Sequence, residues 1–131
     1  MNWELKKNVT DLVDSKLLAE LGVMDGVEPD IYRNRDFDGN EILDHWGVAA
    51  YRLDKLLSKL PEWWREIGMI ESGGELKRVL YSFIDKEVDA WAIRNACRDL
   101  LLSRGQKAVK VAVQLLKLLK EEELLLVLKI S

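Results

Sequence analysis

The stretch from Glu41 to Ile70, EILDHWGVAAYRLDKLLSKLPEWWREIGMI, decides the fold prediction. Its apolar pattern predicts a short helix up to Trp46, a sharp turn at Gly47 and a second helix over residues 50–60. Leucines recur in the second helix at steps of three and four residues, which places them on one face: Leu53, Leu56, Leu57 and Leu60. The stretch therefore predicts two crossing helices, the second anchored in the core along one side.

The opposite side of the second helix is basic. Arg52, Lys55 and Lys59 are spaced so that three cations lie along one ridge. A helix that reads nucleic acid needs this combination, because the core holds one side while the other offers cations to phosphates and base edges. Helices of ordinary bundles show the same combination, so that alternative stays open.

Composition bounds the fold and the compartment. The 131 residues are 48% apolar and 33% charged, which is enough for one domain with a core and too little for two. We expect a single domain over residues 1–131, mainly α, built as a bundle of about five to six helices. The longest apolar run, Leu124 to Leu128, is far short of a membrane span, and the N-terminus lacks a signal-peptide pattern. We therefore expect a cytoplasmic protein.

Charge is unevenly distributed along the chain. Residues 1–48 carry a net charge of −6 and residues 49–120 a net charge of +5, within a total of −3. A locally basic middle suits an anionic partner, whereas solvated helix faces explain the same asymmetry without one.

The chain divides into four segments. Apolar residues at helical spacing predict an N-terminal helix over residues 1–22, ended by Gly22. Turn formers over residues 23–40 predict a loop or a short irregular strand. The helix-turn-helix region occupies residues 41–84, and residues 85–131 hold C-terminal helices and an apolar tail.

Carboxylates are frequent in the loop before Glu41. Their spacing matches the first half of a calcium-binding loop, but Glu41 and His45 do not fit its second half. A better account is helix capping by Asp38 and Glu41. We expect no metal site and no cofactor, and we expect His45 to be a half-exposed helix residue.

Pro61 interrupts the basic helix, because proline lacks a backbone donor and disfavours helix at the preceding residue. Helix is expected again over residues 62–67. The adjacent Trp63 and Trp64 cannot both point into the core. We expect one to be buried and the other to be partly exposed, where it can contact a partner or stack on a nucleic-acid base.

Two structures compete for residues 69–84. In the first, residues 69–72 and 76–84 form a two-stranded wing that turns at Gly73-Gly74, and Lys77 and Arg78 lie near a nucleic-acid backbone. In the second, residues 76–84 are helical. The apolar spacing, which continues to Trp91, favours the helix.

The C-terminal third is predicted to be helical, with a break near residues 85–88. Cys97 lies on an apolar face without a neighbouring base, which indicates a small buried residue rather than a nucleophile. Basic residues are expected on outer positions of this helix: Arg94, Arg98 and Arg104. The final helix is expected over residues 106–122.

A homodimer is expected through the last helix and tail, residues 108–130, because an exposed tail this apolar would aggregate. The alternative is that the tail completes its own core.

The central stretch resembles the winged helix-turn-helix of bacterial and archaeal transcription regulators. The resemblance rests on Gly47, on the apolar positions around it and on REIGMIESGG, over about residues 41–84. It implies a small DNA-binding regulator with 50–60 as recognition helix. The implied contacts are recognition-helix residues Tyr51, Arg52, Lys55 and Lys59 and wing residues Lys77 and Arg78. Pro61 and an extra helical turn before Gly68 depart from that pattern.

A second, shorter pattern is similar to the small all-helical subunit of type III CRISPR effector complexes. It consists of Leu60, Pro61, Trp63, Trp64, Arg65, Gly68 and Met69. This resemblance implies contact with nucleic-acid backbone inside a ribonucleoprotein, and it favours helix at 76–84.

The sequence thus leads to a nucleic-acid-binding protein, with DNA preferred over RNA. The alternative is a helical subunit or protein-interaction module of a larger assembly. We expect no catalysis, because the chain has no glycine-rich phosphate loop, no metal-ligand spacing and no acid and base paired on a common face.

Overall fold

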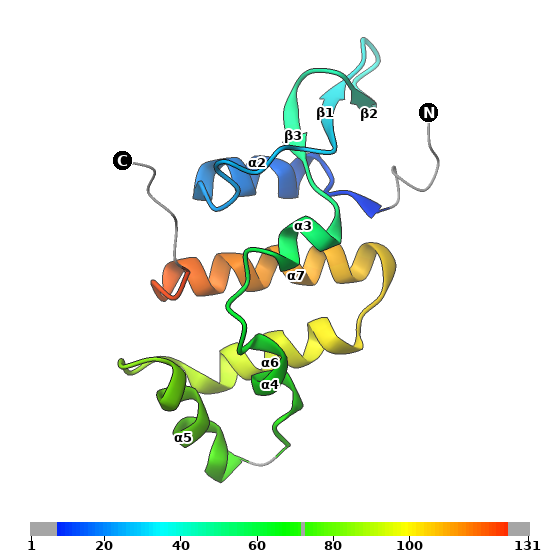
Figure 1. Cartoon of the computed structure of the whole chain (residues 1–131). Helices are drawn as coiled ribbons and strands as arrows, with labels where there is room; N and C mark the ends of the chain where they lie inside the picture. Colours follow the sequence, from blue (N-terminus) through cyan, green and yellow to red (C-terminus); the bar gives the residue numbers. More distant parts are fainter. Residues whose placement is uncertain (1–7, 72, 126–131) are drawn as a thin grey trace.

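The computed structural model describes residues 8–71 and 73–125, and Figure 1 shows the arrangement of its elements. Six helices and three short strands occur within these residues. Their bounds are α2 Leu12–Leu21, β1 Ile31–Arg35, β2 Glu41–Asp44, β3 Val48–Ala50, α3 Leu53–Leu57, α4 Trp64–Met69, α5 Gly73–Phe83, α6 Ala90–Leu102 and α7 Gly105–Glu121. The mainly α prediction is confirmed, with a small sheet in addition. None of the described helices is long and apolar enough to cross a membrane.

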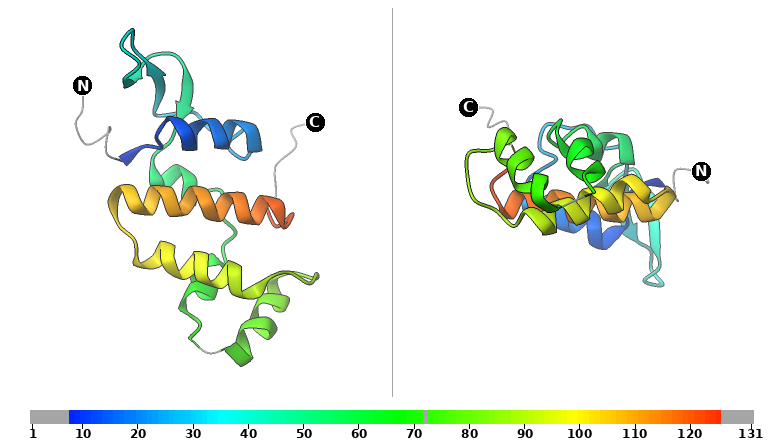
Figure 2. Two further views of the ribbon diagram at one scale, coloured as in Figure 1. Left: turned by 180° about the vertical axis from the view of Figure 1, so that it is seen from behind. Right: turned by 90° about the horizontal axis from the view of Figure 1, so that it is seen from below.

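Helix α7 is the centre of the core. Its apolar arc is wide enough to contact α2, α3 and α6. Buried side chains occur all along it: Ala108, Val109, Ala112, Val113, Leu115, Leu116 and Leu119. In Figure 1 the sheet and α2 lie above α7, and α6 lies below it. Figure 2 shows α3, α4 and α5 on one side of the α6–α7 pair.

The sheet has the strand order β2-β1-β3, and β1 pairs antiparallel with both neighbours. Arg33 of β1 lies opposite Leu43 of β2 and opposite Val48 of β3. Residues 45–47 must therefore carry the chain across β1. A Cβ on Gly47 would lie 2.3 Å from the Arg33 carbonyl oxygen, and its φ is +126°. Only glycine fits this crossing.

The helix predicted up to Trp46 is wrong. Residues 41–44 form β2, because β1 supplies backbone partners that a short helix there would lack. Trp46, which the predicted helix would place on its inner face, is 66% exposed, and His45 is exposed on the crossing. The segment 23–40, predicted as a loop or irregular strand, contains β1.

The second predicted helix is shorter than expected. Residues 48–50 belong to β3, and α3 spans only the five residues from Leu53 to Leu57. The helix pair needed for a helix-turn-helix is therefore not present at 41–60. The stop before Pro61 is confirmed, and helix resumes as α4.

At residues 69–84 the helical alternative is confirmed and the wing is wrong. Helix α5 spans Gly73–Phe83, with Leu76 and Leu80 buried. The predicted break follows it, but Trp91 is 48% exposed rather than part of the apolar stripe.

Arg94 was expected on the surface of α6 and is instead buried. Its guanidinium donates to the backbone oxygens of Ile70 and Glu71 at 2.8 and 3.4 Å. These acceptors belong to the α4–α5 connection, so Arg94 holds that connection against α6. Gly68 allows the close packing of α4 on α6, since a Cβ there would lie 2.5 Å from Leu101 Cδ1.

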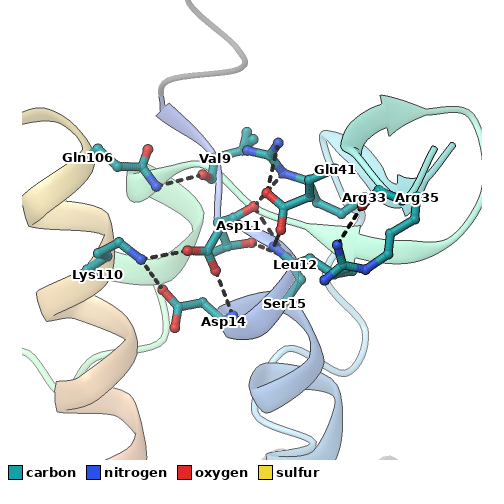
Figure 3. Close-up of polar contacts among 12 residues, drawn as sticks. Val9, Asp11, Leu12, Asp14, Ser15, Arg33, Arg35, Glu41, Gln106 and Lys110 are labelled. Atoms are coloured by element: carbon teal, nitrogen blue, oxygen red, sulfur yellow. Dashed lines mark hydrogen bonds and ion pairs between the residues drawn. The ribbon is translucent and has the colours of Figure 1, made fainter.

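A polar junction joins the sheet to α2 and α7 (Figure 3). We define it by Thr10, Asp11, Asp14, Arg33, Glu41 and Lys110. Arg33 Nε donates to the Thr10 backbone oxygen at 3.0 Å, and its NH1 lies 3.8 Å from Glu41 Oε2. Glu41 Oε1 accepts from the Leu12 backbone N–H at 3.0 Å. Glu41 therefore caps the start of α2, and the predicted cap of a helix at 41–46 is wrong.

The predicted cap by Asp38 is also wrong. Asp36 Oδ1 accepts from the backbone N–H groups of Asp38 and Asn40, both at 2.9 Å. The Asp36 carboxylate thus shapes the β1–β2 turn.

Lys110 connects α7 to the start of α2. Its Nζ lies 2.6 Å from Asp11 Oδ2 and 3.6 Å from Asp14 Oδ2. Burial by itself would raise the pKa of Asp11. The contacts with Lys110 and with the Asp14 backbone N–H together lower this pKa by more than burial raises it, so it falls below the usual 3.8. The pKa of Asp14 is raised by burial and by the Asp11 charge. The two carboxylates therefore contribute to stability with opposite signs.

We predict that Gly47→Ala lowers the free energy of unfolding by about 2–3 kcal/mol, because a methyl group there meets the β1 backbone and strains φ. Gly39→Ala is the matched control. Gly39 also has a positive φ, of +82°, but a Cβ on it meets nothing within 4 Å. Urea unfolding measures both variants, and equal losses would contradict the crossing contact.

Asp11 is the N-cap of α2, and its Oδ1 accepts from the Asp14 backbone N–H at 2.8 Å. We predict that Asp11→Asn lowers the unfolding free energy at neutral pH by less than about 1 kcal/mol, since asparagine can keep this cap and only the Lys110 ion pair is removed. Asp11 has a lowered pKa in the folded state, so its contribution is present above pH 3.8 and disappears as pH falls through that lowered pKa. Asp14→Asn should act in the opposite direction, because the raised pKa of Asp14 makes its charge unfavourable at neutral pH. Unfolding curves across the acid range up to neutral pH compare the variants, and parallel curves for both would contradict the assignment.

Candidate interaction groove

The predicted nucleic-acid contacts on the basic helix lie in different environments. Tyr51 is 7% exposed and belongs to the core. Arg52 is exposed just before α3. Lys55 Nζ donates to the Glu28 backbone oxygen at 2.6 Å and lies 3.3 Å from Asp30 Oδ1. Lys55 therefore holds the loop before β1 and offers less charge to a partner than its spacing suggested.

The remaining predicted contacts form separate groups. Lys59 is half-buried in the turn after α3. Lys77 and Arg78 are exposed on α5, and Arg78 pairs with Glu75 at 3.5 Å. Figure 1 shows α3 above α7 and α5 below it, so these predicted contacts lie on different elements.

The charge asymmetry of the sequence is partly used inside the molecule. Lys55 pairs with Asp30, and Lys110 pairs with Asp11 and Asp14. Each contact joins the acidic first third to the basic remainder of the chain. Part of the charge asymmetry therefore stabilises the fold through these ion pairs and is not evidence for a binding partner.

A groove of about 760 Å³ opens where three elements end close together. Its walls are the turn between α3 and α4, the end of α5 with the following loop, and the end of α7. The lining residues are Ser58, Lys59, Leu60, Pro61, Glu62, Trp63, Phe83, Ile84, Asp85, Lys86, Glu123, Leu124 and Leu125. This size falls in the range of pockets that hold small ligands or anchoring side chains.

An aromatic pair forms part of the lining. The rings of Trp63 and Phe83 stack with centroids 6.2 Å apart and planes 15° apart. Phe83 is 41% exposed, and Trp63 is partly buried. Trp64 points into the core and is 7% exposed. The sequence prediction that one tryptophan is buried and its neighbour partly exposed is confirmed.

Local chain geometry holds each wall. Pro61 follows the end of α3, and its backbone oxygen accepts from the Trp64 N–H at 3.1 Å, which begins the turn into α4. Helix α5 is anchored by buried Leu80, whose backbone oxygen accepts from the Ile84 N–H at 3.0 Å. These contacts fix Trp63 on the wall formed by the α3–α4 turn and Ile84 on the wall formed by the end of α5.

The end of α7 is fixed in the same way. The chain turns at Glu123, which has a φ of +59°. The Leu124 backbone N–H then donates to the Leu119 oxygen at 2.8 Å. This turn holds Leu124 and Leu125 against the main core as the third wall.

The groove carries a small negative charge. Its charged residues are two lysines and three carboxylates, a net of −1. Lys86 pairs with Glu123 at 3.7 Å, which leaves Glu62 and Asp85 as exposed carboxylates without an ion pair in the described part of the chain. An apolar floor with acidic edges suits an apolar ligand that carries a positive charge.

Among the described residues, Cys97 and the possible metal ligands do not form a site. Cys97 is fully buried, and burial raises the pKa of its thiol to about 12, so the thiolate is not available at neutral pH. The prediction that Cys97 is a buried residue is confirmed. No group of three or more His, Cys, Asp and Glu side chains gathers within residues 8–71 and 73–125 to hold a metal ion.

Sequence reasoning found Trp63 and missed the groove. The sequence predicts helix up to Ile84 and an apolar tail from Leu124, but it does not predict that Ile84, Leu124 and Leu125 line one groove. The signal in the sequence was an excess of apolar residues near positions 60, 84 and 124. Helical periodicity describes each helix separately and does not predict that these three ends meet. Only the packing of α7 between α3 and α6 brings these ends together.

Comparison with known proteins gave no match: no family model, no curated protein and no solved structure is similar enough to this chain to indicate a relationship. The comparisons therefore test neither family resemblance, but the helix pair at 41–60 and the wing at 69–84 that the first one implied are not formed in the structure.

Proposed function

We propose that this protein is a non-catalytic interaction module that binds a segment of a partner polypeptide in the groove. The observation that carries the proposal is the stacked pair of Trp63 and Phe83 on an apolar floor. Partly exposed aromatic side chains in apolar pockets provide most of the binding energy at many interfaces. A groove between helix ends also suits the apolar face of an extended or helical peptide.

Charge favours a polypeptide over a nucleic acid in this groove. Glu62 and Asp85 lie at its edges and would repel phosphates, while only Lys59 is a cation without an ion pair among the described lining residues. Nucleic-acid binding depends on several cations that neutralise phosphates together.

Binding of DNA is a second candidate function, favoured by one observation. Lys59 and Trp63 line the same groove, and Arg52 is exposed at the start of α3 nearby in the sequence. A base stacked on Trp63 would bring its phosphate near Lys59. The protein would then act as a small DNA-binding regulator, as the sequence suggested.

We predict that peptides selected from a displayed random library on the wild-type protein bind Trp63→Ala at least about thirtyfold more weakly. This loss corresponds to about 2 kcal/mol, as expected for an aromatic anchor. Trp46→Ala is the control, because Trp46 is 66% exposed and lies outside the groove. Calorimetric titration measures the affinities, and circular dichroism checks folding.

A second variant separates loss of binding from loss of folding. Glu62→Lys changes an exposed groove residue and should weaken binding of basic peptides without disturbing the core. Unchanged affinities in both groove variants would show that the peptides bind elsewhere and would overturn the proposal.

For the second candidate, we predict that replacing Arg52, Lys55 and Lys59 with Ala lowers DNA affinity at least about tenfold. The slope of log affinity against log salt should fall by about 1 for each phosphate that the variant no longer neutralises. The matched control replaces three cations of α7: Lys107, Lys117 and Lys120. Fluorescence anisotropy with labelled single strands and duplexes provides the measurement. Equal affinities of the two triple variants would exclude this surface as the DNA site.

A further inference from the structure

We infer that the polypeptide partner of the groove is a second copy of this chain, which contributes its apolar segment LVLKI, residues 126–130. The inference rests on the proposed function and names its ligand. The segment has four aliphatic side chains and one cation, Lys129, and no carboxylate side chain. Its own fold lies outside the described residues, so the inference uses its chemistry and the geometry of the groove.

Charge complementarity supports this ligand. The edges of the groove offer Glu62 and Asp85, both exposed and without an ion pair in the described part of the chain. One lysine in an apolar segment would pair with either carboxylate while the aliphatic side chains cover the aromatic pair. A more acidic or uncharged apolar segment would leave both carboxylates unpaired at the edge of an apolar contact.

At the end of α7 the chain's own residues already take up one side of the groove. Leu124 and Leu125 already form one wall, fixed by the hydrogen bond to Leu119. The segment LVLKI begins directly after Leu125. A second copy can lay the whole segment across the groove.

Twofold exchange would cover both tails at once. In a symmetric dimer each copy donates one segment and receives one, so two apolar segments and two grooves are covered by the same contact. This arrangement accounts for a sequence in which LLLVLKI, residues 124–130, would otherwise be an aggregation site. It also specifies the homodimer expected through residues 108–130.

Carbodiimide cross-linking of the full chain tests the inference. An equal mixture of unlabelled and ¹⁵N-labelled protein is treated with the reagent, which joins Lys129 to a carboxylate only when the two are in contact. We expect Lys129 joined to Glu62 or Asp85, with roughly half of the joined peptides of mixed isotope, as random pairing of the two pools requires. Joined peptides in which both halves always carry the same label would show contact within one copy and overturn the inference.

A second experiment exchanges the charges of Lys129 and of the two groove carboxylates. Lys129→Glu should weaken the dimer about tenfold in sedimentation experiments, and combining it with Glu62→Lys and Asp85→Lys should restore most of the loss. Lys77→Glu is the matched control on exposed α5 and should have no effect. A monomer at all concentrations, or equal effects of Lys129→Glu and Lys77→Glu, would also overturn the inference.

The two proposals fail in different ways. If selected peptides bind at Trp63 while the chain stays monomeric, the groove is an interaction site for another protein and only the second-copy assignment is wrong. If neither peptides nor a second copy depend on Trp63 and Phe83, the proposed function fails as well.

Discussion

The burial of α7 on several sides is the constraint on which the rest of the structure depends. Each fully buried Leu or Val contributes roughly 1.5–3 kcal/mol relative to exposure, and α7 has such residues on a wide arc, among them Val109, Val113 and Leu116. One neighbouring helix cannot cover that arc. The chain therefore lays α2 with the sheet against one side and α6 against another, with α3 contacting it as well. The groove exists because these layers end together near the last turn of α7.

The sheet depends on polar contacts more than on a core of its own. Its buried cluster holds only Val9, Leu43 and Ala50, with Ile31 packed against them. Such a small cluster does not fix three short strands. Arg33 compensates, because its buried side chain connects the central strand to the segment that leads into α2. Burying a guanidinium is costly unless its donors are satisfied, so the sheet and the start of α2 have to form together.

Sequence periodicity predicted the elements that pack by one regular face and failed where tertiary pairing decides. The helices over 73–83 and 105–121 follow from apolar spacing. Helix α2 ends before Gly22 as predicted but begins only at Leu12, and it buries Asp14 and Ser15 while Val13 is 70% exposed. Residues 41–50 were wrongly predicted, because short apolar runs fit a helix or a strand equally well and the deciding partner, β1, lay in a segment interpreted mainly as a loop. Gly47 was recognised as the site of a sharp turn, but the turn there is a strand crossing rather than a helix pair. The groove was beyond sequence reasoning, since residues near 60, 84 and 124 meet only after α7 is packed.

The same packing changes what the charge pattern means. From the sequence, Arg52, Lys55 and Lys59 form one basic ridge, and that ridge motivated a nucleic-acid partner. In the structure Lys55 holds the loop through Asp30, and Lys110 holds α2 through Asp11, so part of the positive charge serves the fold. A cation engaged by a carboxylate of its own chain must give up that ion pair before it can neutralise a phosphate. The surface left for a partner is then defined by apolar and aromatic residues with acidic edges, which is the chemistry of a polypeptide contact.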